Sequence, residues 1–276
     1  MEEFLKPMNF PDRLRVVQAR KESLLCVGLD VDPQRIPTYL RRSRTGIFDF
    51  ISGIVEATYD LVCAYKPNLA FFEAMGSEGW DLLRRTVALM PRNIITIGDG
   101  KRGDIGNTGE RYATALFDDL KFDAVTISPY MGRDSVEPFL TRPGKGVFLL
   151  ALTSNPGSAD FQRVRVAGRP LYEHVVKLSG TWASGIGYVV GATHPGELKR
   201  VRALAPRAPL LIPGVGSQGG DLEAAVRAGV TAFGDLAVIN ASRSILYASS
   251  GRDFARSART EAKRMQDAME RVRAAL

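Results

Sequence analysis

Residues 94–108 read IITIGDGKRGDIGNT, and this stretch contains the unit from which the fold can be worked out. Its first four residues are β-branched and the fifth is glycine, which predicts a buried strand over residues 94–98. A helix-like segment follows at residues 108–120. Ionisable residues lie between the two. The stretch therefore predicts a strand, a polar loop and a helix, in that order.

The same strand–helix unit recurs along the chain. Short apolar runs predict eight strands, at residues 24–29, 64–67, 94–98, 124–127, 147–152, 188–191, 210–213 and 237–240. Seven of them precede helix-like segments, such as residues 48–62, 78–90, 108–120 and 222–228, and the eighth precedes residues 252–275. Eight alternations predict an α/β protein, a parallel (β/α)8 or TIM barrel. A doubly wound open sheet is the alternative from pattern alone.

The domain organisation is expected to be simple. No long linker rich in Ser, Gly or Pro divides the 276 residues, so we expect a single barrel domain over residues 1–276. Residues 1–20 precede the first strand and are expected to pack outside the barrel, closing its bottom. Residues 32–44 form a long basic segment, expected to be an inserted loop or cap.

Composition narrows the class of protein. The net charge of +7 favours anionic partners, but the basic residues are scattered, as on solvated helix faces. Cys26 and Cys63 lie in apolar runs, which indicates free thiols and a cytoplasmic protein. With only two histidines, His174 and His194, the sequence does not support a His-rich metal site or a Ser-His-Asp triad. The longest apolar run, residues 147–152, is too short to span a membrane, and the first ten residues do not resemble a signal peptide.

Ionisable residues gather at the predicted carboxyl ends of the strands, where barrels of this type place their chemistry. Asp99 and Lys101 follow the third strand and, in a strand-like continuation, point to the same side. Lys66 ends the neighbouring second strand, close enough to meet Asp99. Asp104 lies just beyond them. We expect these four residues to form an alternating array of Lys and Asp, which would keep each lysine protonated.

Two further segments predict an anion site. Residues 213–221, PGVGSQGGD, follow the seventh strand, and their glycines let backbone N–H groups approach a phosphate. Asp221 is placed to cap the next helix. Arg243 follows the eighth strand and offers a planar fork to phosphate. Phosphate sites after the seventh and eighth strands are usual in such barrels.

These motifs resemble those of the orotidine 5′-phosphate decarboxylases, and the match runs in order from about residue 24 to residue 247. The pattern DxKxxDIxNT at residues 99–108 carries the strongest resemblance. The other matching stretches are GLD at 28–30, YKPN at 65–68, TSNPGS at 153–158, GATHP at 191–195, PGVGSQGGD at 213–221 and SRSI at 242–245. The chain looks closest to the longer bacterial branch, which has an extended segment after the first strand. Gly106 departs from the proline that many members carry there.

The resemblance implies a reaction and a set of catalytic residues. The chain would decarboxylate orotidine 5′-phosphate to uridine 5′-phosphate, the last step of UMP biosynthesis, without a cofactor or metal. Lys101 would give a proton to C6 of the pyrimidine, and Asp99 would lie beside the substrate carboxylate. Lys66 and Asp104 would complete the array and hold the ribose. Asp104 and Thr108 would reach in from the partner subunit of a homodimer.

The resemblance also implies how the substrate is bound. Asp30 would bind a ribose hydroxyl, and Ser154 and Gln218 would read the pyrimidine edge. Arg243 and the backbone of the glycine-rich loop would hold the phosphate. The remaining implied substrate contacts are Gly214, Gly216 and Ser242.

Two rival functions remain at this point. A sugar-phosphate synthase or decarboxylase of the same superfamily would use a similar Asp-x-Lys-x-x-Asp segment with Mg²⁺. A non-catalytic nucleic-acid binder would use the basic charge and would bind polynucleotides with a strong salt dependence. The scattered basic residues and the absence of a nucleic-acid-binding motif argue against the second.

Overall fold

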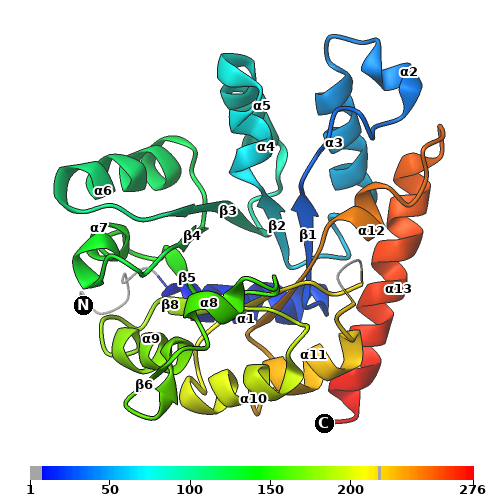
Figure 1. Cartoon of the computed structure of the whole chain (residues 1–276). Coiled ribbons are helices and arrows are strands. Elements are labelled where there is room, and N and C mark those ends of the chain that lie inside the picture. The colour runs from blue at the N-terminus through cyan, green and yellow to red at the C-terminus, as the bar shows by residue number, and fades with distance from the viewer. Residues whose placement is uncertain (1–7, 217–218) are drawn as a thin grey trace, which may run out of the picture.

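The computed structural model describes residues 8–216 and 219–276, and within them eight parallel strands close into a barrel. The strands follow the order β1-β10-β9-β8-β5-β4-β3-β2 around it (Figure 1). Their bounds are β1 Leu25–Leu29, β2 Ala64–Pro67, β3 Ile95–Arg102, β4 Ala124–Ile127, β5 Gly146–Leu152, β8 Ile186–Val190, β9 Leu210–Pro213 and β10 Ala237–Ala241. Leu25 of β1 pairs with Ile239 of β10, which closes the sheet. The predicted (β/α)8 barrel is confirmed, and the open doubly wound alternative is excluded.

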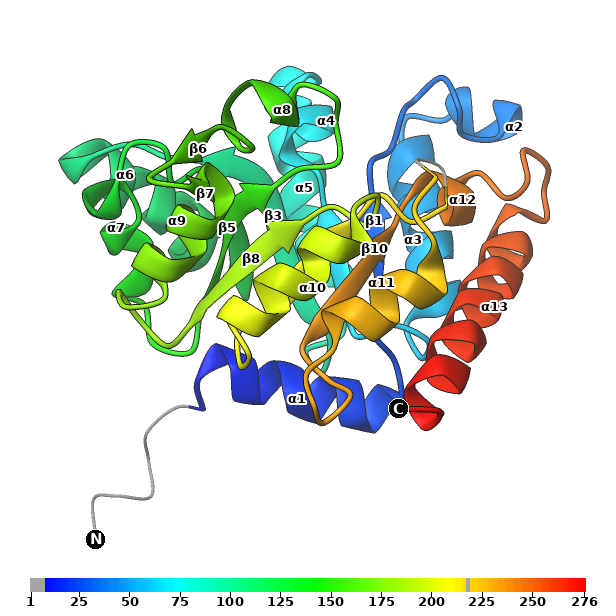
Figure 2. The same ribbon diagram turned by 60° about the horizontal axis from the view of Figure 1, so that its bottom comes forward.

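Helices surround the barrel (Figures 1 and 2). Those between or after the strands are α3 Gly46–Thr58, α4 Leu69–Glu73, α5 Gly76–Leu89, α6 Gly106–Ala113, α7 Glu137–Leu140, α9 Leu171–Ser179, α10 Pro195–Leu204, α11 Leu222–Gly229, α12 Arg243–Leu246 and α13 Phe254–Ala274. The helix predicted at residues 108–120 is α6 followed by a π-helical turn, Thr114–Asp119. Thr38–Arg41 form a short helix, α2, within the basic segment 32–44.

Other short elements are inserted in the segments that follow β4 and β5. They are a 3-10 turn at Arg133–Ser135, α8 Ser158–Phe161 and a hairpin of β6 Arg165–Val166 with β7 Arg169–Pro170. None of the helices in the described ranges is both long and apolar enough to cross a membrane.

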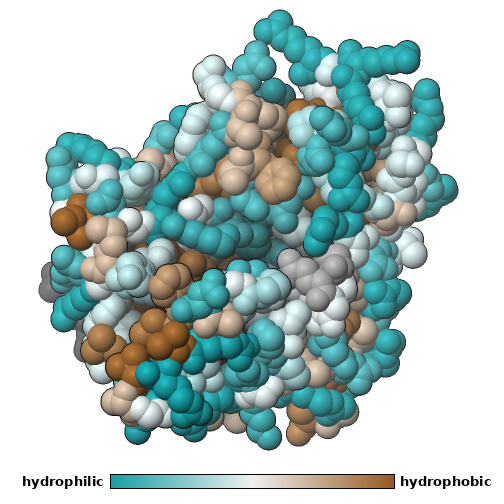
Figure 3. Space-filling view, viewed as in Figure 1, coloured by the Kyte–Doolittle hydropathy of each residue, from teal (hydrophilic) through white to brown (hydrophobic). Residues whose placement is uncertain are grey.

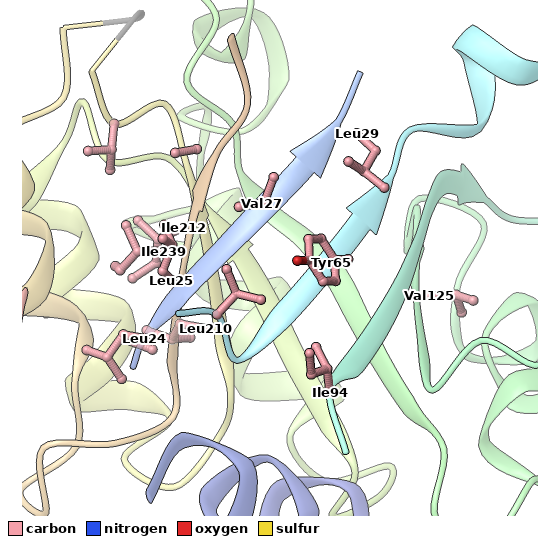
Figure 4. Packing of buried hydrophobic residues seen from close by; sticks show 14 of the residues in the cluster. Leu24, Leu25, Val27, Leu29, Tyr65, Ile94, Val125, Leu210, Ile212 and Ile239 are labelled. Carbon is pink, nitrogen blue, oxygen red and sulfur yellow. The ribbon is translucent and has the colours of Figure 1, made fainter. Parts of the chain in front are cut away.

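Side chains of each strand alternate between the barrel interior and the surrounding helices. On β1, Leu25, Val27 and Leu29 face outward into the layer of helices, where they join Ile212 and Ile239 (Figure 4). Cys26, between them, belongs to a separate interior cluster with Phe148, Val189, Leu211 and Val238, among others. These two cores, one inside the sheet and one around it, hold the strands in register.

Helix α1, Phe10–Lys21, crosses the amino-terminal end of the barrel (Figure 2). Phe10 packs edge-on against Phe148 with ring centroids 5.8 Å apart, so its side chain plugs the interior from below. The Gln18 side chain donates to the Ala237 carbonyl at 2.7 Å and accepts from Leu236 N at 2.9 Å. Among the described residues, α1 closes this end, so the barrel is open at the opposite end, where the strands terminate.

Candidate active site

A cavity of about 500 Å³ opens at the carboxyl ends of the strands. Figure 3 shows hydrophilic residues around the hollow near the middle of this face. The predicted site residues that line it are Asp30, Lys66, Asp99, Lys101, Ser154, Gly214, Ser242 and Arg243. Asp104, Thr108 and Gly216 were also predicted, but they are not among the lining residues. Gln218 lies outside the described residues.

Asp99 is the centre of the charged array. Its Oδ2 atom lies 2.5 Å from Lys66 Nζ, and its Oδ1 atom lies 2.7 Å from Lys101 Nζ. The side chains of Lys66 and Asp99 are only 5% and 9% exposed, whereas that of Lys101 is 46% exposed. The array therefore consists of one buried lysine, one buried carboxylate and one lysine that reaches the open cavity.

Burial and charge act in opposite directions on these groups. Burial would raise the pKa of Asp99, but the ammonium groups of Lys66 and Lys101 outweigh it and hold that pKa well below its usual range. Burial would likewise lower the pKa of Lys66, but Asp99 and Asp30 raise it above its usual value. Asp99 and Lys66 are therefore both ionised across the physiological pH range.

Asp104 takes no part in the array of its own chain. Its Oδ1 atom accepts a hydrogen bond from the Ile105 backbone N–H at 2.8 Å. In the part of the chain that the structure describes, no ion pair joins Asp104 to Lys66 or Lys101. Thr108, on the first turns of α6, is exposed to solvent. Three of the four predicted charged residues thus meet within one chain.

Asp30 follows β1 and faces the same cavity. Its Oδ1 atom is buried and has no hydrogen-bond partner among the described residues. A buried acceptor without a partner costs free energy unless a ligand supplies the donor. A hydroxyl group is a suitable donor for an ionised carboxylate.

The opposite side of the cavity is formed by the ends of β9 and β10. Gly214 and Gly216 have φ angles of +96° and +77°, which glycine adopts readily. The Gly216 N–H donates to the Gly220 carbonyl at 3.3 Å, so it is used within the loop. Asp221 accepts from the N–H groups of Glu223 and Ala224, which confirms the predicted helix cap.

Arg35 and Tyr247 line the cavity and were not singled out from the sequence. The Tyr247 hydroxyl accepts from Asp32 N at 2.8 Å and donates to the Asp30 carbonyl at 3.2 Å, which fixes the chain after β1. The Arg35 guanidinium lies 4.0 Å from the centre of the Tyr247 ring. No local motif marks these residues, because their partners are more than 200 positions away in the sequence.

A metal site finds no support in the side chains. Across residues 8–216 and 219–276, no three His, Cys, Asp or Glu side chains are grouped so that they could hold a metal ion. The ionisable groups that do meet are two lysines and one aspartate, and the ammonium groups already occupy the carboxylate oxygens of Asp99.

Comparisons with known proteins agree on one family. The family model described as "Orotidine 5'-phosphate decarboxylase / HUMPS family" matches residues 23–258. The orotidine 5'-phosphate decarboxylase of Dehalococcoides mccartyi is 48% identical over 96% of this chain and 99% of its own length, and that of Verminephrobacter eiseniae is 51% identical over 96% and 100%. The structure of Leishmania donovani OMP decarboxylase superposes with a TM-score of 0.85 at 40% identity, covering 98% of this chain and 100% of that one.

Proposed function

Since the chain belongs to the orotidine 5′-phosphate decarboxylase / HUMPS family, we propose that its array of Lys66, Asp99 and Lys101 catalyses the decarboxylation without a cofactor. The chain converts orotidine 5′-phosphate to uridine 5′-phosphate and CO₂, which is the last step of UMP biosynthesis. The resemblance of its motifs to this family is confirmed. The observation that supports the assignment of the site is the position of Asp99 between Lys66 and Lys101 in the cavity.

Lys101 is the proposed proton donor. When the bond from C6 to the carboxylate breaks, CO₂ leaves and the electron pair remains on C6 as a vinyl carbanion without a conjugated sink. A fixed ammonium group beside C6 stabilises this charge and then transfers a proton to it. Lys101 suits the role because its side chain is 46% exposed to the cavity, whereas Lys66 is buried behind Asp99.

Asp99 has two proposed roles. It holds both ammonium groups in place through hydrogen bonds of 2.5 and 2.7 Å. Its carboxylate, which stays ionised, lies beside the carboxylate of the bound substrate and favours its departure as neutral CO₂. Lys66 keeps Asp99 charged and contributes to holding the ribose.

The rest of the cavity is proposed to hold the nucleotide. The Oδ1 atom of Asp30, which has no partner among the described residues, accepts from a ribose hydroxyl. Ser154, which lines the cavity, binds the pyrimidine edge together with Gln218, which lies outside the described residues. Arg243, Ser242 and Gly214, which line the cavity, form the phosphate end together with Gly216, after the seventh and eighth barrel strands. Phosphate is remote from the bond that breaks, so its binding energy serves to orient the pyrimidine against Lys101.

A homodimer with shared sites is proposed for the assembly. Asp104 and Thr108 do not line the cavity of their own chain, which fits a role in the site of a partner subunit. Apolar side chains are exposed after β3 and β4, at Ile105, Tyr130 and Met131. Exposed apolar groups of this kind are usual where a second subunit packs.

The domain organisation, the cellular location and the absence of macromolecular partners are also part of the proposal. One barrel domain would span the chain, because the eight barrel strands and the longer helices around them contribute to the same two cores. Free, buried thiols at Cys26 and Cys63 suit the cytoplasm. No membrane or nucleic-acid partner is proposed, since the basic residues are scattered along the chain, as on solvated helix faces.

The function is tested by adding orotidine 5′-phosphate to the purified protein and following its ultraviolet absorbance. Turnover should proceed at the same rate with and without an excess of EDTA. A rate that falls on chelation and returns with Mg²⁺ would contradict the cofactor-free mechanism. Mixing the protein with a polynucleotide at low salt should leave the rate unchanged.

A further inference from the structure

The end of β3 departs from regular strand geometry. Gly98 pairs with Val125 of β4, and the next pair is Arg102 with Ile127. Three residues of β3, from Asp99 to Lys101, therefore lie opposite a single residue of β4, Thr126. Such a bulge leaves backbone groups without ladder partners and redirects the side chains on the bulged strand.

Lys101 has a left-handed backbone conformation within this bulge, with φ of +47°. That conformation is unfavourable for a residue with a Cβ atom, and it persists only where surrounding contacts impose it. The bulge brings the side chains of Asp99 and Lys101 together by this turn rather than by the regular alternation of a strand.

The Thr126 hydroxyl makes two hydrogen bonds to the bulge. It accepts from the Lys101 backbone N–H at 2.9 Å and donates to Oδ1 of Asp99 at 2.9 Å. The directions follow from chemistry, because a backbone N–H can only donate and an ionised carboxylate can only accept. The same Oδ1 atom accepts from Lys101 Nζ. One hydroxyl thus joins the backbone of Lys101 to the carboxylate that its ammonium group contacts.

Thr126 is fixed in this position. It is only 1% exposed, and its neighbours on β4, Val125 and Ile127, are buried in the outer core. A β-branched side chain has few χ1 options, so its hydroxyl keeps its direction.

We propose that Thr126 is a positioning residue for decarboxylation, which sets the location of the Lys101 ammonium group by holding the left-handed turn and Asp99 in one hydrogen-bonded unit. This inference rests on the roles proposed above for Lys101 and Asp99. Thr126 itself transfers no proton. Its effect should appear in the chemical step, because a small displacement of the ammonium group from C6 weakens an interaction that matters most in the transition state.

Thr126→Val keeps the shape of the side chain and removes both hydrogen bonds. We expect kcat to fall by roughly tenfold to a hundredfold, the equivalent of one charge-assisted hydrogen bond, with KM within about threefold of wild type. Thr126→Ser keeps the hydroxyl and should return kcat to within about fivefold of wild type. A purely structural role would lower the melting temperature without this split between kcat and KM.

Thr96→Val is the matched control. The Thr96 side chain is also little exposed, at 6%, and its hydroxyl accepts from Asp123 N at 3.1 Å and donates to Asp123 Oδ2 at 3.0 Å. It therefore has the same pair of partners, a backbone N–H and a carboxylate, but it lies at the closed end of the barrel. The control should lose a comparable amount of thermal stability while kcat stays within about twofold of wild type.

Several results would overturn the proposal. They are a kcat for Thr126→Val within threefold of wild type, a loss that appears only in KM, and a Ser variant as slow as the Val variant. If the Val variant does not fold, the Ser and Ala variants are compared instead, because they also differ by the hydroxyl. A Lys101→Ala protein whose turnover is within tenfold of wild type would contradict the proton-donor role proposed above for Lys101. An inactive Lys101→Ala protein beside a normal Thr126→Val protein would contradict only the role of Thr126.

Discussion

The Nζ atom of Lys66 lies 2.5 Å from Oδ2 of Asp99, and both side chains are almost fully withdrawn from water. Each charge offsets much of the cost of burying the other, since removing one partner leaves a buried charge poorly compensated. Asp99 has a second partner in Lys101, but that side chain is half exposed and holds the carboxylate from the cavity side. The two lysines are therefore not equivalent, and the first prediction depends on this difference.

Replacing Lys66 by Met should reverse the contribution of Asp99 to the pH dependence of the free energy of unfolding. In the wild-type protein the depressed pKa of Asp99 adds stability that is present above the unfolded pKa of about 3.9 and is lost only as pH falls below it. Without Lys66, the largest of the charges that offset burial is lost, and we expect the pKa of Asp99 to rise above that unfolded value. The carboxylate then costs stability as pH rises. The raised pKa of Lys66 matters only at much higher pH.

The loss of unfolding free energy in Lys66→Met should therefore grow from pH 4 to pH 7, reaching about 3–5 kcal/mol. Urea unfolding at the two pH values measures it. Lys101→Met serves as the control, and because its side chain is 46% exposed it should lose about 1 kcal/mol or less. A loss that stays constant or shrinks towards pH 7 would show that Lys66 does not set the charge of Asp99.

Lys101→Ala should lower turnover by about 1,000-fold or more, since a positioned proton donor accounts for effects of this size. The fold and some affinity for uridine 5′-phosphate should survive, because the side chain is half exposed. Lys121→Ala is the matched control, as Lys121 also has a positive φ, +65°, but lies outside the cavity. Turnover of Lys101→Ala within tenfold of wild type would refute the assignment of the proton donor.

Arg243→Ala tests the phosphate end. The variant should lose about 1.5–3 kcal/mol of transition-state stabilisation on orotidine 5′-phosphate, the scale of a charge-assisted hydrogen bond. The loss on orotidine, which lacks the phosphate, should be far smaller. Arg252→Ala is the control, because Arg252 lies over the Tyr39 ring and does not line the cavity. Equal losses on the two substrates would mean that Arg243 does not bind phosphate.

Mixed dimers test the shared site. Homodimers of Lys101→Ala and of Asp104→Ala should both be nearly inactive. Random pairing of the two chains makes about half of the dimers mixed, and two-fold symmetry gives each mixed dimer one site with both substitutions and one with neither. Activity should then return to about a quarter of wild type. If native mass spectrometry detects mixed dimers and activity does not rise, Asp104 serves its own chain.

The barrel could be predicted from the sequence because each strand carries a local signal. Runs of β-branched and apolar residues such as residues 94–98 and 147–152 are short, buried and separated by helical segments. The extension of β3 to Arg102 could not be predicted, because Lys101 adopts a left-handed conformation that its own sequence does not favour. That conformation depends on the Thr126 hydroxyl, which belongs to another strand.

The active site, like the barrel, could be predicted where its residues carry a local sequence signal. Lys66, Asp99 and Lys101 carry a dense local motif, and the structure brings them together. Thr126 had only a weak signal, a polar residue in a buried strand. Arg35 and Tyr247 had none, since they meet through contacts between the first and last parts of the chain. The contribution of Asp104 cannot be read within a single chain, because the proposed partner is a second copy.

The pairing of β1 with β10 also constrains how the protein is made. Leu25–Leu29 leave the ribosome early, whereas their second neighbour, Ala237–Ala241, is among the last segments to be synthesised. Until then one edge of β1, a strand with apolar side chains, has unpaired backbone N–H and C=O groups, and newly made chains can associate wrongly through such an edge. The strands that carry Lys66, Asp99 and Lys101 are complete long before the strand that precedes Arg243. A nascent chain thus holds its reactive groups well before it can hold a nucleotide against them, and chain termination ahead of β10 would leave a sheet with two open edges.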